Sequence, residues 1–189
     1  MKDELRLETL LNFYFNLRID PIEASINRAY RDFNRTAPLG NNETKIERDK
    51  SKIRIVDLMK KKIEFILKHK FKNQDKFDSY HKKTCKEIQK EWGILTFGQI
   101  QKWVNMSLKY CLIFGEKRIN GIAKNYIFFH IPIDRIILEK IFEEKNPKAW
   151  SKIKDYNIYF EYQITFRQKH PKEIPIIYET NLFNMNINS

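Results

Sequence analysis

The chain has 189 residues, of which 42% are hydrophobic and 14% aromatic, and this composition excludes an intrinsically disordered protein. Five glycines and six prolines are too few for a turn-rich β-sandwich, so an all-α fold is expected. The net charge of +12 favours phosphate-rich partners, nucleic acid before an anionic membrane, with solubility alone as the alternative.

The N-terminal part of the sequence predicts two helices and a loop. Apolar residues recur at three- and four-residue spacing over 4–18, which is typical of an amphipathic helix. Its predicted apolar face consists of Leu7, Leu10, Leu11, Tyr14 and Leu17. Asp20 before Pro21 signals a second helix start, because the carboxylate can cap free N–H groups and proline needs no donor there. Residues 36–44 predict a loop by composition.

Two lysine-rich helices are predicted next, over 46–70 and 75–91. Each has an apolar stripe at helical spacing, while lysines cover much of the remaining surface. Such runs are usually solvated faces, and a surface that follows phosphates is the functional alternative. On the second interpretation, Lys60 and Lys61 are candidates for contacts to nucleic acid.

The second half of the chain predicts four further helices. Residues 98–113 form the most hydrophobic one, and Asp134 starts the next after a proline. The stretch 155–169 contains strand-favouring residue types, but its apolar spacing favours a helix capped by Asp155. One short helix is expected after Pro171. The last four residues, Asn186–Ser189, are expected to be a disordered tail.

Cysteine and histidine positions give no metal signature. Cys85 and Cys111 form no CxxC pair and the four histidines are scattered, so no structural zinc and no cofactor are expected. The N-terminal segment lacks the uninterrupted apolar core of a signal peptide, and no stretch is long enough to span a membrane. We expect a reduced, cytoplasmic protein without a membrane partner.

A lysine and an aspartate stand near two predicted helix starts. Lys102 lies near the start of the helix over 98–113, and Asp134 follows it by 32 positions. An amine must be partly neutral to act as a nucleophile. Burial, repulsion from a nearby Lys109 and the positive end of a helix dipole all favour the neutral form. An ionised Asp134 can align the amine or stabilise positive charge developing at a sugar carbon.

The residues around this pair carry a resemblance to a known family. Residues 95–102, LTFGQIQK, look like a hairpin-then-lysine motif, and residues 130–137, HIPIDRII, resemble a proline–x–aspartate helix start. Together they resemble the helix-hairpin-helix DNA glycosylases, above all the archaeal 8-oxoguanine branch. The lysine of that branch opens a helix in which a second lysine follows, as Lys109 follows Lys102 here. The resemblance covers residues 95–140.

The resemblance implies base excision from DNA by a compact, two-lobed helical fold. No linker divides the chain clearly, so a single domain over 1–189 is expected, in which 1–91 and 92–185 would be the lobes. Lys102 would attack the sugar C1′ and form a Schiff base that permits strand cleavage, and Asp134 would assist the attack. The family's hairpin is rich in glycine because its backbone amides approach a phosphate. Of those glycines this chain keeps only Gly98, with Gly93 upstream.

Other residues are candidates for holding the polymer, which is expected to be DNA. A target base must leave the duplex before excision and can then stack on an aromatic side chain. The base-stacking candidates are Trp92, Trp103 and Trp150. The candidates for further contacts, besides the two α-helical lysines at 60 and 61, are Gly98, Gln101, Lys109 and Arg135.

Structural roles compete with each of these interpretations. Asp134 can be a plain N-cap, Lys102 a solvated side chain, and Arg135 the partner of an acidic residue one turn on. The alternative to a glycosylase is therefore a non-catalytic helical domain that binds nucleic acid. A helical nuclease or toxin-type defence protein ranks last, because Arg167 and His170 are closer together than the catalytic Arg–His pair of such proteins.

Overall fold

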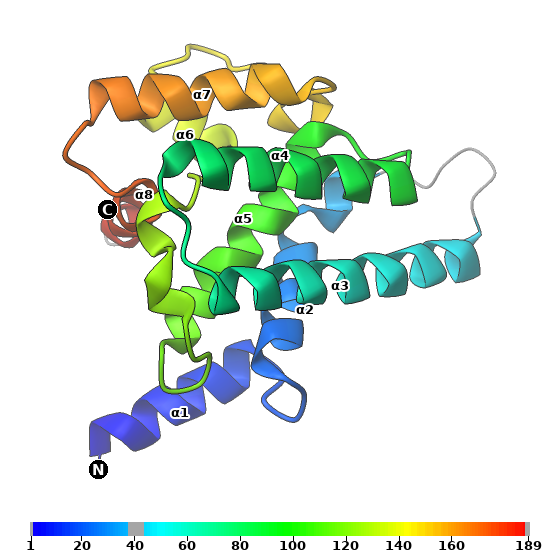
Figure 1. The fold of residues 1–189 in the computed structure, drawn as a ribbon, viewed down its shortest axis with the longest axis vertical. Coiled ribbons are helices and arrows are strands. Elements are labelled where there is room, and N and C mark those ends of the chain that lie inside the picture. The colour runs from blue at the N-terminus through cyan, green and yellow to red at the C-terminus, as the bar shows by residue number, and fades with distance from the viewer. Residues whose placement is uncertain (1, 38–43, 188–189) are drawn as a thin grey trace.

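The computed structural model describes residues 2–37 and 44–187, and these ranges contain helices but no strand. The all-α prediction is therefore confirmed for the described part of the chain (Figure 1). The α-helices are α1 Lys2–Tyr14, α2 Pro21–Phe33, α3 Lys45–Lys68, α4 Gln74–Glu91, α5 Phe97–Phe114, α6 Arg135–Lys140, α7 Tyr156–Lys169 and α8 Pro175–Ile187. The short 3₁₀ helices are η1 Asn34–Thr36, η2 Ile122–Lys124, η3 Tyr126–Phe128 and η4 Trp150–Lys152.

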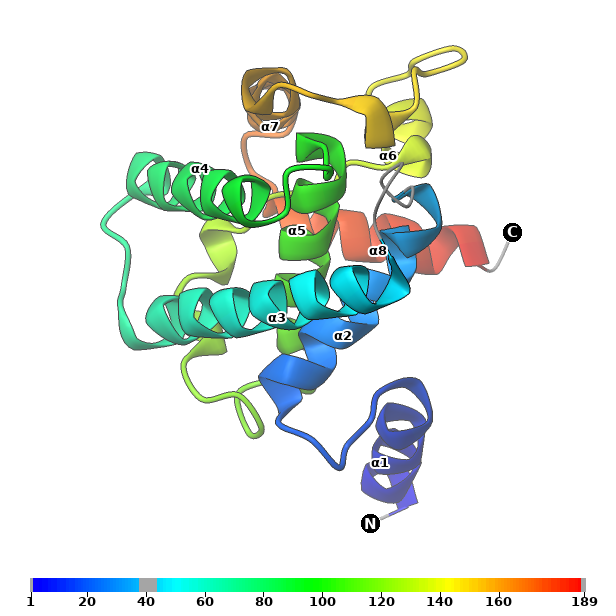
Figure 2. The same cartoon turned by 90° about the vertical axis from the view of Figure 1, so that its right-hand side faces the viewer.

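Helix α5 passes through the centre of the molecule, with other helices around it (Figure 2). It packs most extensively on α2 and also contacts α4, α7 and η4, so the first helix of the second predicted lobe lies against the first lobe. A reciprocal capping box starts α5, since the Thr96 hydroxyl accepts from the Gln99 N–H and the Gln99 side chain accepts from the Thr96 N–H.

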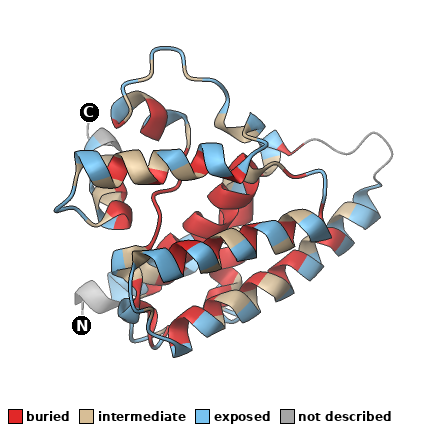
Figure 3. Ribbon diagram, turned by 45° about the horizontal axis from the view of Figure 1, so that its top comes forward, coloured by how far each residue is buried: buried red, intermediate tan, exposed pale blue. Residues whose placement is uncertain are grey.

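Side chains all around α5 are buried (Figure 3). The sequence pattern assigns Lys102, Asn105, Met106 and Lys109 to a separate, more polar face, and these four residues are buried as well. A helix that is buried all round must satisfy its polar groups inside the protein. The partners of these groups define the candidate site described below.

The predicted N-cap residues of two helices are confirmed. The Asp20 side chain accepts from the Glu23 N–H at the start of α2, and Asp155 accepts from the Asn157 N–H at the start of α7. The predicted ranges 46–70, 75–91, 98–113 and 155–169 agree with α3, α4, α5 and α7 to within two residues at each end. Capping uses hydrogen bonds between near neighbours in the chain, so it can be predicted without tertiary structure.

Two predictions at the ends of the chain are wrong. Helix α1 lies at the edge of the bundle and ends at Tyr14, with Leu7 and Leu10 of its predicted apolar face 54% and 66% exposed. Leu11 and the following Phe15 make its buried contacts instead. At the other end, α8 continues to Ile187, so residues 186 and 187 are helical; residues 188–189 lie outside the described ranges. Most of the predicted loop at 36–44 also lies outside them.

Candidate active site

A cleft of about 810 Å³ opens between α2, α5, α6 and α8. Cationic side chains outnumber carboxylates on its walls. The cations are Arg28, Arg31, Arg35, Lys102, Lys109 and Arg135, and the carboxylates are Asp32, Asp134 and Glu179. The remaining lining is largely apolar or aromatic, and it includes Met106, Ile136 and Trp150. Basic and aromatic groups together suit a ligand that has both phosphate and ring systems.

Lys102 and Asp134 meet in this cleft. The Lys102 Nζ lies 2.6 Å from the Asp134 Oδ2, and both residues line the cleft. The other carboxylate oxygen, Oδ1, accepts a hydrogen bond of 3.0 Å from the Ile137 N–H and so caps α6. The capping role and the pairing with lysine therefore coexist, because each uses a different oxygen. Capping holds the carboxylate in a single orientation toward the amine.

Gln101 fixes the separation of the two residues. Its side-chain amide donates to the Ile133 carbonyl at 2.7 Å and accepts from the Ile133 N–H at 3.1 Å. Gln101 precedes Lys102 in α5, and Ile133 precedes Asp134 in the extended segment before α6. This two-point contact therefore sets the register between amine and carboxylate. Gln163 of α7 makes the same paired contact with Ile131, at 2.9 and 3.0 Å.

A buried polar network supports the extended segment from behind. The His130 ring lies 2.7 Å from a carboxylate oxygen of Asp78 and 2.7 Å from the Tyr159 hydroxyl. Arg167 binds both oxygens of Asp78, at 2.8 and 3.0 Å. Asn105 of α5 links this group back to Gln101 at 3.1 Å and to Tyr159 at 2.9 Å. Apart from the buried Arg167 Nε, which has no hydrogen-bond partner in the described residues, these polar groups are paired with one another, and the pairing gives the segment one defined position.

Burial determines the charge states within this network. It lowers the pKa of His130, and it lowers the pKa of His81 well below its ordinary value. Burial alone would raise the pKa of Asp78, but hydrogen bonds from His130 and Arg167 outweigh it and hold that pKa far below its ordinary value. Both histidines are therefore neutral near pH 7, and the carboxylate is ionised. Histidines that look scattered in the sequence come together, with the ring centroids of His81 and His130 4.3 Å apart.

The charge of Lys109, which was expected to repel Lys102, is compensated by a carboxylate. Its Nζ lies 2.5 Å from a carboxylate oxygen of Glu179 in α8. The helix dipole also disfavours the charge of Lys102 less than expected, because α5 begins at Phe97 and Lys102 lies beyond its first turn.

Asp32 of α2 is a further carboxylate of the cleft. Burial raises its pKa, although the Tyr110 hydroxyl donates to this carboxylate at 2.7 Å.

The three tryptophans differ in access to the cleft. Trp150 is half-buried and lines it. Trp103 is fully buried, donates its ring N–H to the Ile26 carbonyl at 3.0 Å and packs against Tyr30 and Phe33. Trp92 is buried as well. Trp150 is thus the member of the predicted set that lines the same cleft as the Lys102–Asp134 pair.

The other residues predicted to contact nucleic acid differ in whether they are exposed in the cleft. Arg135 lines the cleft and is highly exposed, although its side chain pairs with Glu139 at 2.7 Å. Gly98 and Gln101 are buried and have no surface to offer a polymer. Lys60 pairs with Asp20 at 3.6 Å, and neither it nor Lys61, both on α3, lines the cleft.

The sequence interpretation missed the contribution of α2 to the site. Arg28, Arg31 and Arg35 line the cleft, together with Asp32. A signal was present, because arginines at positions i, i+3 and i+7 fall on one face of a helix. Only the apolar positions of this segment entered the helix prediction. Glu179 was missed because nothing near it in the sequence relates it to Lys109.

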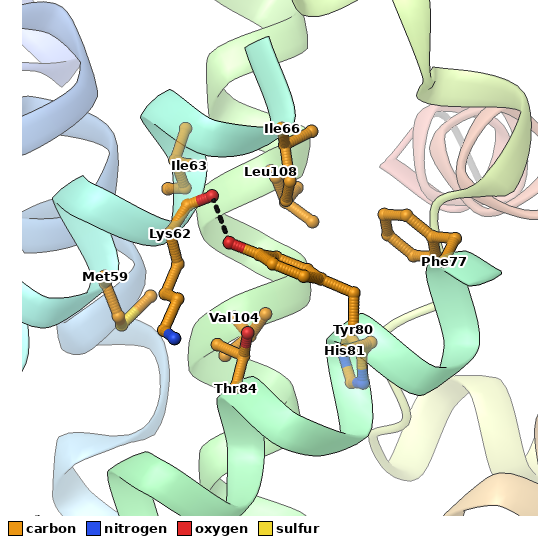
Figure 4. Close-up of a pocket in the computed structure, with 10 residues that line it drawn as sticks. All are labelled: Met59, Lys62, Ile63, Ile66, Phe77, Tyr80, His81, Thr84, Val104 and Leu108. Atoms are coloured by element: carbon orange, nitrogen blue, oxygen red, sulfur yellow. Dashed lines mark hydrogen bonds between the residues drawn. The ribbon is translucent and has the colours of Figure 1, made fainter. Parts of the chain in front are cut away.

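A second, much smaller hollow lies between α3, α4 and α5 (Figure 4). Its lining is apolar apart from a few groups, and Figure 4 shows the Tyr80 hydroxyl directed at the Lys62 carbonyl, which it reaches at 3.0 Å. The Lys62 ammonium pairs with Glu87 at 2.6 Å. Glu87 does not line this hollow, whereas both members of the Lys102–Asp134 pair line the larger cleft, so the candidate chemistry is assigned to the cleft.

Comparisons with protein-family models, curated proteins and solved structures gave no match to this chain. In the described residues, no helix has the length and apolar character needed to cross a bilayer. Across the same ranges, no group of three or more His, Cys, Asp or Glu side chains is placed to hold a metal ion. The geometry of the cleft is therefore the feature of this protein that bears on its function.

Proposed function

We propose that this protein is a DNA base-excision N-glycosylase in which Lys102 is the nucleophile, with Schiff-base lyase activity. The observation that supports this proposal is the 2.6 Å contact between the Lys102 amine and the Asp134 carboxylate in a cationic, partly aromatic cleft. A carboxylate at hydrogen-bond distance can take a proton from the amine and prepare it for attack. It also remains beside the sugar, where positive charge develops.

The reaction proceeds in two stages. The Lys102 nitrogen forms a bond to the sugar C1′ while the bond from C1′ to the base breaks, and the base leaves with the electron pair and takes up a proton. The nitrogen then loses its second proton, the bond from C1′ to the ring oxygen breaks, and that oxygen takes up a proton, which leaves a protonated Schiff base (C1′=N). Removal of a proton from C2′ forms a C2′=C3′ double bond, and the phosphate leaves C3′ with the electron pair of the broken C3′–O bond, which cuts the strand.

Trp150 supplies the aromatic face for the extruded base. It lies in η4, which packs against the first turns of α5, and so it is positioned near the Lys102 side of the cleft. Stacking of a base on an aromatic ring contributes about 1–3 kcal/mol and tolerates different bases. The same cleft therefore combines an attacking amine, a carboxylate and a platform for a flipped nucleotide.

Borohydride trapping tests this function. Full-length protein is mixed with a panel of DNA duplexes that carry one damaged or modified base each, and borohydride is added to reduce a Schiff base to a stable adduct. We expect an adduct with at least one lesion for the wild type and for Lys83→Ala, an exposed lysine on α4 outside the cleft. We expect none for Lys102→Ala.

Three outcomes would contradict the proposal. An adduct that persists in Lys102→Ala would show that another amine reacts. Tight DNA binding without an adduct for any lesion would favour the non-catalytic helical domain. If Lys102→Ala stopped trapping but still released the base, attack would be hydrolytic, with Asp134 acting on water. Circular dichroism and a melting curve for each variant distinguish lost chemistry from lost folding.

A further inference from the structure

Three arginines form a row along one wall of the cleft. Arg28 and Arg31 belong to α2, and Arg35 belongs to η1, which continues directly from it. At about 1.5 Å per residue the row is roughly 10 Å long. One strand of B-DNA carries a phosphate about every 3.4 Å along the helix axis, so the row can reach about three consecutive phosphates.

The three side chains are held differently. The Arg28 guanidinium lies 4.1 Å from the Tyr14 ring centroid, donates to the Tyr14 hydroxyl at 2.6 Å and pairs with Asp32 at 3.5 Å. Arg31 and Arg35 are exposed, and within the described residues neither guanidinium forms an ion pair or a hydrogen bond. One end of the row is therefore anchored, and the remaining two charges are available to a ligand.

Of the four arginines that line the cleft, Arg28 and Arg135 pair with carboxylates, whereas Arg31 and Arg35 form no ion pair within the described residues. Arg54 pairs with Glu91, Arg135 with Glu139, and Arg167 with Asp78. A guanidinium has planar, forked donors that match a phosphate oxygen pair. Two such groups at the edge of a cationic cleft, with no ion pair or hydrogen bond to the described residues, fit a phosphodiester chain better than a small neutral ligand.

The start of α5, by contrast, offers little to a phosphate. The Gly98 N–H donates to the Ile153 carbonyl at 3.0 Å, and a Cβ at this position would lie 1.9 Å from the Trp150 carbonyl oxygen. The glycine is therefore required for close packing of η4 against α5. Its amide is occupied within the protein, so contacts to the nucleic-acid backbone must be made elsewhere.

We propose that Arg31 and Arg35, with Arg28 as their anchored neighbour, bind consecutive phosphates of the DNA strand that carries the target base. This inference rests on the proposed glycosylase function, since it assigns the strand that enters the cleft. The row holds that strand against α2 while its extruded nucleotide reaches Lys102. The arginine row thus takes the role that the resemblance assigns to a hairpin.

The test measures how DNA binding depends on salt. Kd for a lesion-containing duplex is measured by fluorescence anisotropy between about 50 and about 200 mM salt. The proteins are the wild type, Arg31→Gln/Arg35→Gln and the control Lys83→Gln/Lys86→Gln, which removes two exposed charges from α4. Loss of two phosphate contacts should reduce the slope of log K against log salt by about 1.8 and weaken binding ~10-fold. The control should stay close to the wild type.

Chemistry is measured separately by single-turnover borohydride trapping at saturating protein. We expect the arginine variant to need ~10-fold more protein than the wild type to saturate trapping, because it holds the strand less tightly, whereas Lys83→Gln/Lys86→Gln, outside the cleft, should match the wild type. An unchanged salt slope in the arginine variant, or an equal loss in the control, would overturn the phosphate assignment. Failure of the wild type to trap any lesion would overturn the glycosylase function alone, because the salt slope would still report on the arginines.

Discussion

Two lysines seven residues apart on α5 each pair with a carboxylate from another part of the chain, and the two pairs differ in how far they are exposed. Lys102 meets Asp134 at 2.6 Å, and Lys109 meets Glu179 at 2.5 Å. The side chains of the first pair are 8% and 23% exposed, whereas those of the second are 7% and 5% exposed. A short lysine–carboxylate contact is therefore not by itself a sign of catalysis.

The neighbours of each carboxylate explain the difference. Asp134 caps α6, follows a segment that Gln101 and Gln163 hold in register, and keeps part of its side chain open to the cleft. Glu179 lies in the middle of α8 and is almost fully enclosed. Ion pairs that are fully enclosed rarely add stability, but breaking one leaves an uncompensated charge. We infer that the first pair is reactive and that the second ties α8 to α5.

The largest expected effect is on the rate of adduct formation, which should depend on Lys102 and much less on Lys109. Lys102→Gln should lower the single-turnover rate of adduct formation by ~10³-fold or more, because no other amine lies at hydrogen-bond distance from Asp134 in the described residues. Lys109→Gln, assayed at a temperature where it is folded, should stay within about 10-fold of the wild type. An equal loss of trapping rate in the two variants would contradict the inference that only the Lys102–Asp134 pair is reactive.

The enclosed pair should matter most for stability. Lys109→Met should lower the free energy of unfolding by about 3–5 kcal/mol, because Glu179 would be left buried without a counter-charge. Adding Glu179→Leu should recover much of the loss, since both charges are then removed. Urea denaturation of the single and double variants measures this. A double variant no more stable than the single one would contradict the account.

The register of the open pair can be tested through the two glutamines. Gln101→Leu leaves the N–H and carbonyl of Ile133 without partners and also removes an acceptor of Asn105, which should cost about 2–4 kcal/mol of stability and slow trapping as Asp134 shifts. Gln163→Leu is the matched control, because it frees the same two groups at Ile131, further from the carboxylate. Its stability loss should be similar and its effect on trapping smaller. Equal effects on trapping would show that Gln101 has no special positioning role.

The smallest expected effect concerns pH, and it involves the network behind the open pair. The pKa values of His81 and His130 are lowered by burial, so the unfolded chain takes up protons below its histidine pKa of ~6.5 while the folded protein does not. Stability should therefore fall by about 1 kcal/mol between pH 7 and pH 6. The lowered pKa of Asp78 adds a loss only below about pH 4. Urea midpoints that stay level from pH 7 to pH 6 would contradict this assignment.

Lys102 and Asp134 could be selected from the sequence, but the contact that positions them could not. Both residue types sit near helix starts in the sequence, and the resemblance over 95–140 predicted that they act together. The structure brings the two side chains to 2.6 Å from each other, and neither spacing nor composition contains the Gln101 contact that sets this distance. The Gln101 contact joins a side chain to backbone groups 32 positions away, and only packing of α5 against the extended segment brings them together.

The sequence alone determined the helical class, the positions of the long helices and their capping residues. These depend on periodicity and on hydrogen bonds between residues a few positions apart, as at Asp20, Thr96 and Asp155. Tertiary structure decided which polar residues of α5 are buried, that Trp150 is the tryptophan at the cleft, and that the arginines of α2 line it. Those features depend on which helix faces meet, and contacts between distant segments leave no local pattern in the chain.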